Sequence, residues 1–224
     1  MEIEVLRSRN EAERHMAATR AVEVLEGGGI VVHPTETIYG IGGNCTPENN
    51  ALLSRVKLRG AEQPLLLLTP DLDALRSAFG ELDWPPETDL LVEHFWPGPL
   101  TVVVGCAGAP KGLVGPGGGI AVRVSPDPTV AAIMRRWRRP MTSTSANLAG
   151  CEPPRTLEQA LQVFAGREDL ANIDVPILAI DAGTTKGTTP STIVSFVESP
   201  PQLLREGLVT LEQLEPWLAS SRRI

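Results

Sequence analysis

The opening of the chain constrains the fold most, because a strand, a helix and a second strand follow one another there without a long loop. Alternating residues at the N-terminus predict a short strand, and Asn10 with Glu13 forms the pattern of a capping box that begins a helix. Three glycines after Glu26 end that helix, and the apolar residues 30–32 predict a buried strand. A start of this kind favours an α/β domain.

The same alternation of elements continues along the chain. Short apolar or β-branched runs predict strands over residues 65–68, 101–106, 120–124, 177–180 and 193–197. Periodic patterns predict helices over residues 10–26, 47–56, 71–79, 90–95, 129–137, 156–165 and 211–218. The first helix is expected to bury Met16, Val22 and Leu25. The run at 65–68 is wholly apolar, which is typical of a central strand.

Composition and charge narrow the class of protein. The 224 residues show no linker, so we expect one domain over residues 1–224. A net charge of −7 argues against a protein whose main task is to bind a long phosphate backbone. Three widely spaced cysteines give neither a disulfide framework nor a zinc site. The sequence shows no signal core and no apolar run of membrane length, so we expect a cytoplasmic protein without a membrane partner.

A run of hydroxyl side chains stands out in the second half of the chain. Residues 142–145 are all Ser or Thr, and Asn147 follows within the segment 141–150. We expect this segment to be a loop, with Thr142 and Thr144 turned towards the scaffold. Many hydroxyls suit a ligand rich in oxygen, but an ordinary solvated loop has the same composition and stays open as the alternative.

Cations occur beside several predicted strands. Lys57 and Arg59 follow a helix, where they either complement the helix dipole or face an anion. Arg123 interrupts an apolar strand, which requires either an anionic partner or a solvated face. No Ser–His–Asp set and no pair of metal-binding carboxylates is recognisable in the polar loops. From the residues alone, the chain is predicted to be an α/β enzyme that handles phosphate groups.

Seven motifs in a fixed order carry a resemblance to a known family. They are HPTETIYGIGGN, KLRGAEQPL, WPGPLTVVV, AVRVSPDP, STSANLAG, PSTIV and LLREG, and they span about residues 11–209. In this order they resemble the YrdC-like family, and in particular its single-domain L-threonylcarbamoyladenylate synthases. The resemblance implies a twisted mixed parallel and antiparallel sheet, with helices packed around it and a wide concave site.

The resemblance also implies an activity, a cofactor and partners. Members combine L-threonine, bicarbonate and ATP into threonylcarbamoyl-AMP and pyrophosphate, with Mg²⁺ held through the ATP phosphates and no separate protein metal site. Downstream tRNA threonylcarbamoyl-transferase proteins then modify adenosine 37 of tRNA. The alternative is an RNA-binding paralogue without synthase activity, for which the basic run 135–139 leaves open a weak tRNA contact. A solvated helix end is the simpler explanation of that run.

Individual residues are assigned by the family motifs that they match. The L-threonine contacts expected from the resemblance are Thr37, Arg123 and Ser143. The expected ATP contacts are Arg59, Gln63, Ser145, Asn147, Ser191 and Arg205. Catalytic roles are expected for Lys57 and Arg59. This chain departs from the family at Gly60, where proline is usual, and at Leu68, where many members carry a threonine-binding histidine.

Overall fold

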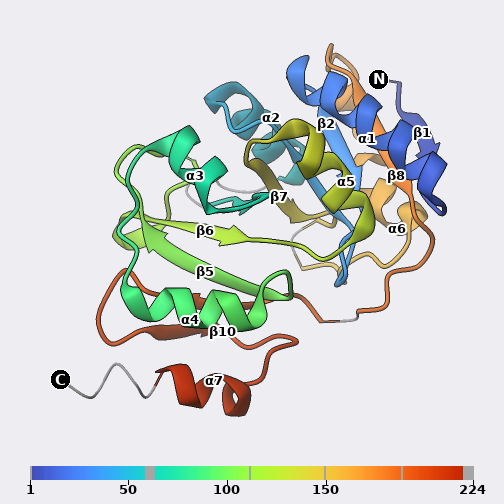
Figure 1. The fold of residues 1–224 in the computed structure, drawn as a ribbon. Coiled ribbons are helices and arrows are strands. Elements are labelled where there is room, and N and C mark those ends of the chain that lie inside the picture. Colours follow the sequence, from blue (N-terminus) through green and yellow to red (C-terminus); the bar gives the residue numbers. More distant parts are fainter. Residues whose placement is uncertain (1, 59–63, 111, 149, 188, 219–224) are drawn as a thin grey trace.

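The structure is a computed structural model that describes residues 2–58, 64–110, 112–148, 150–187 and 189–218. A ten-stranded mixed sheet runs through it with helices packed against both faces (Figure 1). In spatial order the strands are β1 (Glu4–Arg7), β8 (Ile177–Asp181), β2 (Ile30–His33), β3 (Gly40–Gly43), β7 (Met141–Ser145), β4 (Leu66–Leu68), β6 (Gly119–Arg123), β5 (Leu100–Gly105), β9 (Thr192–Ser195) and β10 (Gln202–Arg205). The helices are α1 (Glu11–Glu26), α2 (Pro47–Lys57), α3 (Leu72–Phe79), α4 (Pro86–Phe95), α5 (Pro128–Trp137), α6 (Leu157–Leu161) and α7 (Leu211–Leu218).

Strand direction alternates irregularly across the sheet. Four neighbouring pairs are parallel: β1 with β8, β8 with β2, β4 with β6, and β5 with β9. The other pairs are antiparallel. The α/β class and the mixed sheet predicted from the sequence are therefore confirmed.

Helix α1 shows how the N-terminal sequence specifies its structure. The Asn10 side chain accepts a hydrogen bond from the Glu13 N–H at 2.9 Å, and the Arg9 N–H donates to the Glu13 carboxylate at 2.7 Å. This is the predicted helix start. The expected burial of Met16 is wrong, because 60% of that residue is exposed. The helix instead packs against α5 through small side chains, including Ala17 and Ala21, which let the two helices approach closely.

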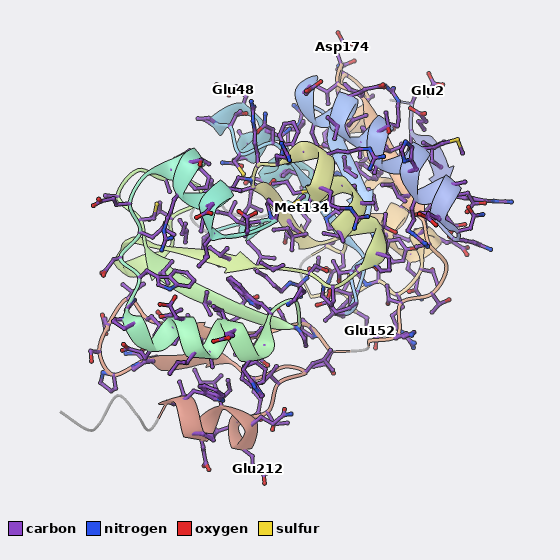
Figure 2. All side chains as sticks on the ribbon, in the orientation of Figure 1. Glu2, Glu48, Met134, Glu152, Asp174 and Glu212 are labelled. Atoms are coloured by element: carbon purple, nitrogen blue, oxygen red, sulfur yellow. The ribbon has the colours of Figure 1, made fainter. Side chains whose placement is uncertain are left out.

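Two apolar clusters cover the two faces of the sheet. In β2, Ile30 and Val32 belong to one cluster and Val31 to the other, as the alternation of side chains along a strand requires. The second cluster includes Met134 of α5 and lies between the sheet and helices α1 and α5. The acidic residues Glu48 and Glu212, labelled with Met134 in Figure 2, are exposed at the periphery. Strand β4, which contains most of the apolar run 65–68, is the sixth of the ten strands and thus central, as predicted.

Strand β7 is one of the elements that the sequence places wrongly, since residues 141–145 were expected to be a loop. Its first part, Met141–Ser143, pairs with β4, and its last two residues pair with β3. The Thr142 hydroxyl accepts from the Gly43 N–H and donates to the Gly43 carbonyl, both at 3.0 Å. A β-branched residue suits a strand, and here its hydroxyl also satisfies backbone groups of β3 where the regular ladder is interrupted.

Strand β10 was not predicted at all. It lies at the sheet edge, antiparallel to β9, and three of its four residues are exposed. An edge strand with so little burial has no apolar alternation from which it could be recognised. The helix predicted at 211–218 is confirmed as α7, which lies beyond β10 and contacts α4 (Figure 1).

The close approach of β3 to β7 generates a stability prediction. A Cβ atom at Gly42 would lie 1.8 Å from the Thr142 carbonyl oxygen, so Gly42→Ala must move backbone. We expect it to destabilise the fold by ~2 kcal/mol or more, equivalent to a fall of about 4–8 °C in the Tm measured by circular dichroism. Gly27→Ala is the control, because its Cβ would meet no atom closer than 3.4 Å. An equal fall in both variants would contradict the expected crowding.

Candidate active site

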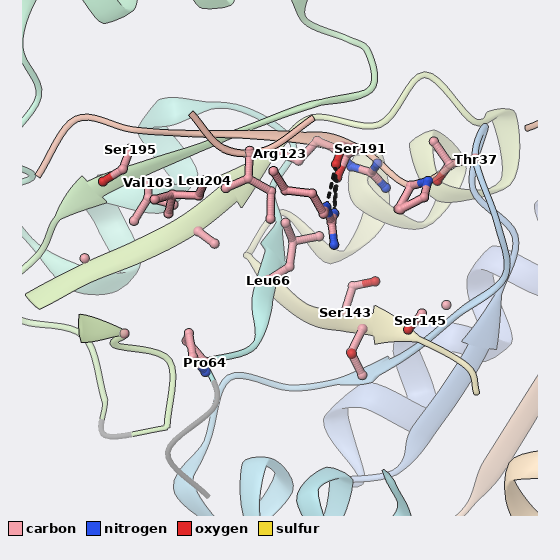
Figure 3. A pocket seen from close by; sticks show the side chains of 18 of the residues that line it. Thr37, Pro64, Leu66, Val103, Arg123, Ser143, Ser145, Ser191, Ser195 and Leu204 are labelled. Carbon is pink, nitrogen blue, oxygen red and sulfur yellow. Dashed lines mark hydrogen bonds between the residues drawn. The ribbon is translucent and has the colours of Figure 1, made fainter. Parts of the chain in front are cut away.

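A cavity of about 610 Å³ opens on the sheet at β7, which lies between β3 and β4, and its volume is within the range of small-molecule sites. Its walls come from β4, β5, β6, β7, β9 and β10, together with the loop that follows β2 and the glycines before β6. Figure 3 shows Thr37, Ser143, Ser145 and Ser191 gathered at one end, and Val103, Ser195 and Leu204 at the other. The concave site expected from the sequence therefore exists.

The polar end is held rigidly by short-range hydrogen bonds. The Thr35 hydroxyl accepts from the Ile38 N–H at 3.1 Å and contacts the Thr37 hydroxyl at 2.8 Å, which closes the loop after β2 on itself. Residues 182–187 cover this loop from outside, since the Tyr39 hydroxyl donates to the Gly183 carbonyl at 2.8 Å. A Cβ at Gly187 would lie 2.7 Å from Thr37 Cα, so the two loops fit only with glycine there.

Arg123 on β6 is buried and lines the cavity. Its guanidinium pairs with the Glu36 carboxylate at 3.1 Å, and the other carboxylate oxygen accepts from the Ser125 hydroxyl at 2.6 Å. The anionic partner that the sequence requires is thus Glu36. Burial lowers the pKa of Arg123 from its usual value, and Glu36 and Asp127 partly offset this. Arg123 Nε is buried and has no hydrogen-bond partner among the described residues.

A second guanidinium reaches the same cavity from β10. Arg205 donates to the Ser191 carbonyl at 2.8 and 3.0 Å and contacts the Ser191 hydroxyl at 3.3 Å (Figure 3). That hydroxyl also lies 2.9 Å from the Thr101 hydroxyl of β5. Burial lowers the pKa of Arg205, and the positive charge of Arg123 lowers it further. Both guanidinium groups at this end of the cavity can bind an anionic ligand, while the carboxylates of Glu36 and Asp127 act on Arg123.

His33, at the end of β2, lies behind the polar wall. It is completely buried, with Nδ1 3.0 Å from the Pro34 carbonyl oxygen and Nε2 3.3 Å from the Ser143 hydroxyl. Burial lowers the pKa of His33 to about 4, an effect that the Pro34 carbonyl partly offsets and Arg123 reinforces. The ring is therefore neutral near pH 7.

The Sua5/YciO/YrdC family model, described as "Telomere recombination", matches residues 23–207. The chain belongs to the Sua5/YciO/YrdC family. The threonylcarbamoyl-AMP synthase of Xylella fastidiosa strain M12 is 34% identical over 189 residues, which are 82% of this chain and 95% of that protein. The corresponding protein of Pyrococcus abyssi is 31% identical over 197 residues, 87% of this chain. This chain spans only about half of that longer relative, 55% of its length.

Solved structures of the family give the same fold. The crystal structure of P. abyssi Sua5 complexed with L-threonine superposes with a TM-score of 0.81 at 29% identity, over 97% of this chain and 61% of that one. Escherichia coli YciO superposes with a TM-score of 0.74 over 92% of this chain, and at 22% identity this likeness concerns the fold alone.

Six of the residues that the sequence predicts for the site of this Sua5/YciO/YrdC member line the cavity. These residues are Thr37, Arg123, Ser143, Ser145, Ser191 and Arg205. Arg59 and Gln63 lie outside the described residues. Thr144 was expected to turn towards the scaffold, but it too contributes to the wall.

Lys57 and Asn147 take a different place from the one expected. Among the described residues that line the cavity, neither is present. The Lys57 amine instead contacts the carbonyl oxygens of Ser145 and Asn147, and the Asn147 amide donates to the Cys151 carbonyl at 2.6 Å. A lysine at the end of α2 thereby holds the turn that leaves β7. This geometry favours a positioning role for Lys57, and its predicted catalytic role stays a prediction.

Sequence reasoning missed the residues that support the wall from behind. In the sequence, Glu36 is only an acidic residue between Thr35 and Thr37. No local pattern predicts its ion pair with Arg123, which is distant in the chain. His33 immediately precedes a proline and carried no nucleophile pattern. The apolar end, formed by residues such as Leu66, Val103 and Leu204, looked like ordinary strand sequence.

The buried neutral His33 predicts a pH dependence of stability. The unfolded ring binds a proton below about pH 6.5, whereas the folded ring does so only near pH 4. Stability is therefore complete above pH 6.5 and falls as the pH drops from 6.5 towards 4. From pH 7 to 4, the free energy of unfolding should fall ~3 kcal/mol more in the wild type than in His33→Phe, measured by urea denaturation. Ser8→Ala, which removes a buried hydroxyl contact to Thr129, is the control and should retain the wild-type pH dependence.

Proposed function

We propose that this protein is an L-threonylcarbamoyladenylate synthase, which joins L-threonine, bicarbonate and ATP and releases pyrophosphate. The observation that carries the proposal is the cavity itself, in which two guanidinium groups and several hydroxyls share one end while Val103 and Leu204 add apolar surface at the other. Such a cavity suits an amino acid and a nucleotide bound side by side. Relatives named threonylcarbamoyl-AMP synthase at 31% and 34% identity support the same activity.

L-threonine is assigned to the end near Thr37, Ser143 and Arg123. The planar guanidinium of Arg123, which lines the cavity, suits the two oxygens of a carboxylate. Glu36 holds the guanidinium from the far side, so little side-chain freedom is lost when the amino acid binds. The P. abyssi protein, whose structure contains L-threonine, supports this substrate.

ATP is assigned to the rest of the cavity. Arg205, Ser191 and Ser145 supply charge and hydrogen bonds for the phosphates, and the apolar side chains of Val103 and Leu204 suit the adenine ring. Arg59, Gln63, Asn147 and Lys57 remain proposed nucleotide or catalytic residues from the sequence motifs. Mg²⁺ would neutralise charge on the leaving pyrophosphate. The described residues contain no cluster of three or more metal-binding side chains, so the proposal places this ion on the phosphate oxygens.

The reaction needs positioning more than acid–base chemistry. The threonine nitrogen forms a bond to the carbon of bicarbonate while a C–O bond of bicarbonate breaks; the nitrogen loses a proton, water leaves, and a carbamate results. A carbamate oxygen then bonds to the α-phosphorus while the bond from that phosphorus to the β-phosphate oxygen breaks, and pyrophosphate leaves. Holding both substrates in one cavity removes much of the entropic cost of this encounter, and Arg205 lies where it can stabilise charge that develops on the phosphates.

The product's use is also part of the proposal. Threonylcarbamoyl-AMP would pass to tRNA threonylcarbamoyl-transferase proteins that modify adenosine 37 of tRNA in the cytoplasm. The structure describes no helix long and apolar enough to cross a membrane.

A second candidate function, RNA binding without synthesis, is favoured only by the exposed Arg135, Arg138 and Arg139 at the end of α5.

Threonine-dependent release of pyrophosphate tests the activity. Purified protein with ATP, bicarbonate and Mg²⁺ should release pyrophosphate only when L-threonine is added, and absence of this dependence would overturn the proposal. RNA binding that is lost in a variant lacking Arg135, Arg138 and Arg139, in a protein without synthase activity, would favour the second candidate.

Replacement of Arg123 tests the assignment of the two ends. Arg123→Ala should weaken L-threonine binding at least tenfold, because a charge-assisted contact is lost, and should change ATP binding much less. Both affinities can be measured by isothermal titration calorimetry. Arg123→Lys keeps the charge but not the planar fork, and Arg135→Ala removes an exposed arginine as the matched control. Equal losses for both ligands would contradict the assignment.

A further inference from the structure

We propose that His33 fixes the direction of the Ser143 hydroxyl, so that Ser143 accepts a hydrogen bond from the amine of the amino-acid substrate. His33 is then a positioning residue that sets which group of the substrate faces Ser143. The inference rests on the proposed function, which it deepens by naming how the amino acid is oriented.

The hydrogen-bond partners of the ring determine its tautomer. His33 Nδ1 lies 3.0 Å from the Pro34 carbonyl oxygen, which can only accept, so Nδ1 carries the proton. In the neutral ring Nε2 is then an acceptor. Ser143 Oγ lies 3.3 Å from Nε2, and its hydroxyl must therefore be the donor in this contact. A serine hydroxyl has one proton, so the remaining capacity of Ser143 is that of an acceptor.

Local packing keeps the pair in this arrangement. Both residues are buried, with 0% of His33 and 3% of Ser143 exposed. A Cβ atom at Gly40 would lie 2.8 Å from His33 Cε1 and 3.0 Å from Ser143 Oγ, so only glycine at position 40 leaves room for ring and hydroxyl together. Ser143 still lines the cavity, and Figure 3 shows it rising from β7 into the space below Arg123.

Proton transfer to His33 is a poorer explanation of the pair. No carboxylate contacts the ring in the described part of the chain, because Nδ1 is bound to a carbonyl oxygen. A protonated His33 would be buried near the Arg123 guanidinium, and the pKa of about 4 shows how unfavourable this is. His33 therefore acts through the hydroxyl direction rather than as a base.

The fixed hydroxyl has a consequence for the substrate. An acceptor at Ser143 repels a carboxylate and attracts an N–H, so the amino acid binds with its carboxylate towards Arg123 and its amine towards Ser143. A freely rotating hydroxyl could instead donate to the amine and occupy its lone pair. Because that lone pair must form the bond to carbon, keeping Ser143 as an acceptor leaves the nucleophile free to react.

The test measures steady-state kinetics and ligand binding for His33→Phe, His33→Gln, Ser143→Ala and the double variant His33→Phe/Ser143→Ala. His33→Phe should raise the KM for L-threonine about three- to tenfold, the effect of a neutral hydrogen bond, while the KM for ATP stays unchanged. His33→Gln offers an amide oxygen to Ser143 and should recover most of the loss. The double variant should be no worse than Ser143→Ala alone, because His33 acts only through Ser143.

A substrate analogue identifies the group that Ser143 binds. 3-Hydroxybutyrate keeps the carboxylate and the hydroxyl of threonine but lacks the amine, so its affinity in calorimetry should be the same for wild type and His33→Phe. Ser8→Ala removes a buried hydroxyl contact outside the cavity and is the control for a general loss of stability. If His33→Phe does not fold, the affinities for L-threonine and 3-hydroxybutyrate are compared in Ser143→Ala and His33→Gln instead, and this comparison tests the role of His33.

The outcomes separate the inference from the function on which it rests. Where the wild type is an active synthase, three results would overturn the role of His33. They are additive losses in the double variant, equal losses of ATP and L-threonine binding in His33→Phe, and a loss of 3-hydroxybutyrate affinity that matches the loss for L-threonine. A wild type without threonine-dependent pyrophosphate release would overturn the proposed function, and the inference with it.

Discussion

The position of β7 between β3 and β4 is the constraint on which the rest of the structure depends. Met141–Ser143 pairs with β4, while Thr144 and Ser145 pair with β3, so a single five-residue strand joins both halves of the sheet. Between Met141 and Thr144 the ladder with β3 is interrupted, and the Thr142 hydroxyl replaces the missing bonds through Gly43. The cavity lies where the two halves meet, so the hydroxyls of Ser143 and Ser145 come from a strand rather than from a loop.

Electrostatics give the cavity its preference. Arg123 and Arg205 come from different strands. Burial lowers the pKa of each guanidinium, and the positive charge of Arg123 lowers the pKa of Arg205 further. Glu36 and Asp127 offset part of this effect for Arg123. A carboxylate or phosphate ligand would be a further anionic partner for these two guanidinium groups.

The sequence predicts those parts of the fold and site that are local in the chain. Asn10 and the apolar run of β4 signal their elements through neighbouring residues, and ordered motifs indicate six of the residues that line the cavity. Met16 was misplaced because the close contact of α1 with α5 is decided by alanines, which carry little apolar signal. The pairing of Glu36 with Arg123 depends on strand order, which no local pattern encodes. For the same reason the burial of His33 behind Ser143 could not be predicted.

The leucine at position 68, where many family members carry a threonine-binding histidine, can also be explained by its surroundings. Leu68 is completely buried in the apolar cluster that contains Val130 and Met141, and it is absent from the described cavity wall. An imidazole placed among these neighbours would lose its hydration without gaining a hydrogen-bond partner from them. His33, by contrast, has an acceptor on one nitrogen and a donor on the other. The buried imidazole of this chain lies instead on β2, where the Pro34 carbonyl and the Ser143 hydroxyl satisfy its two nitrogens.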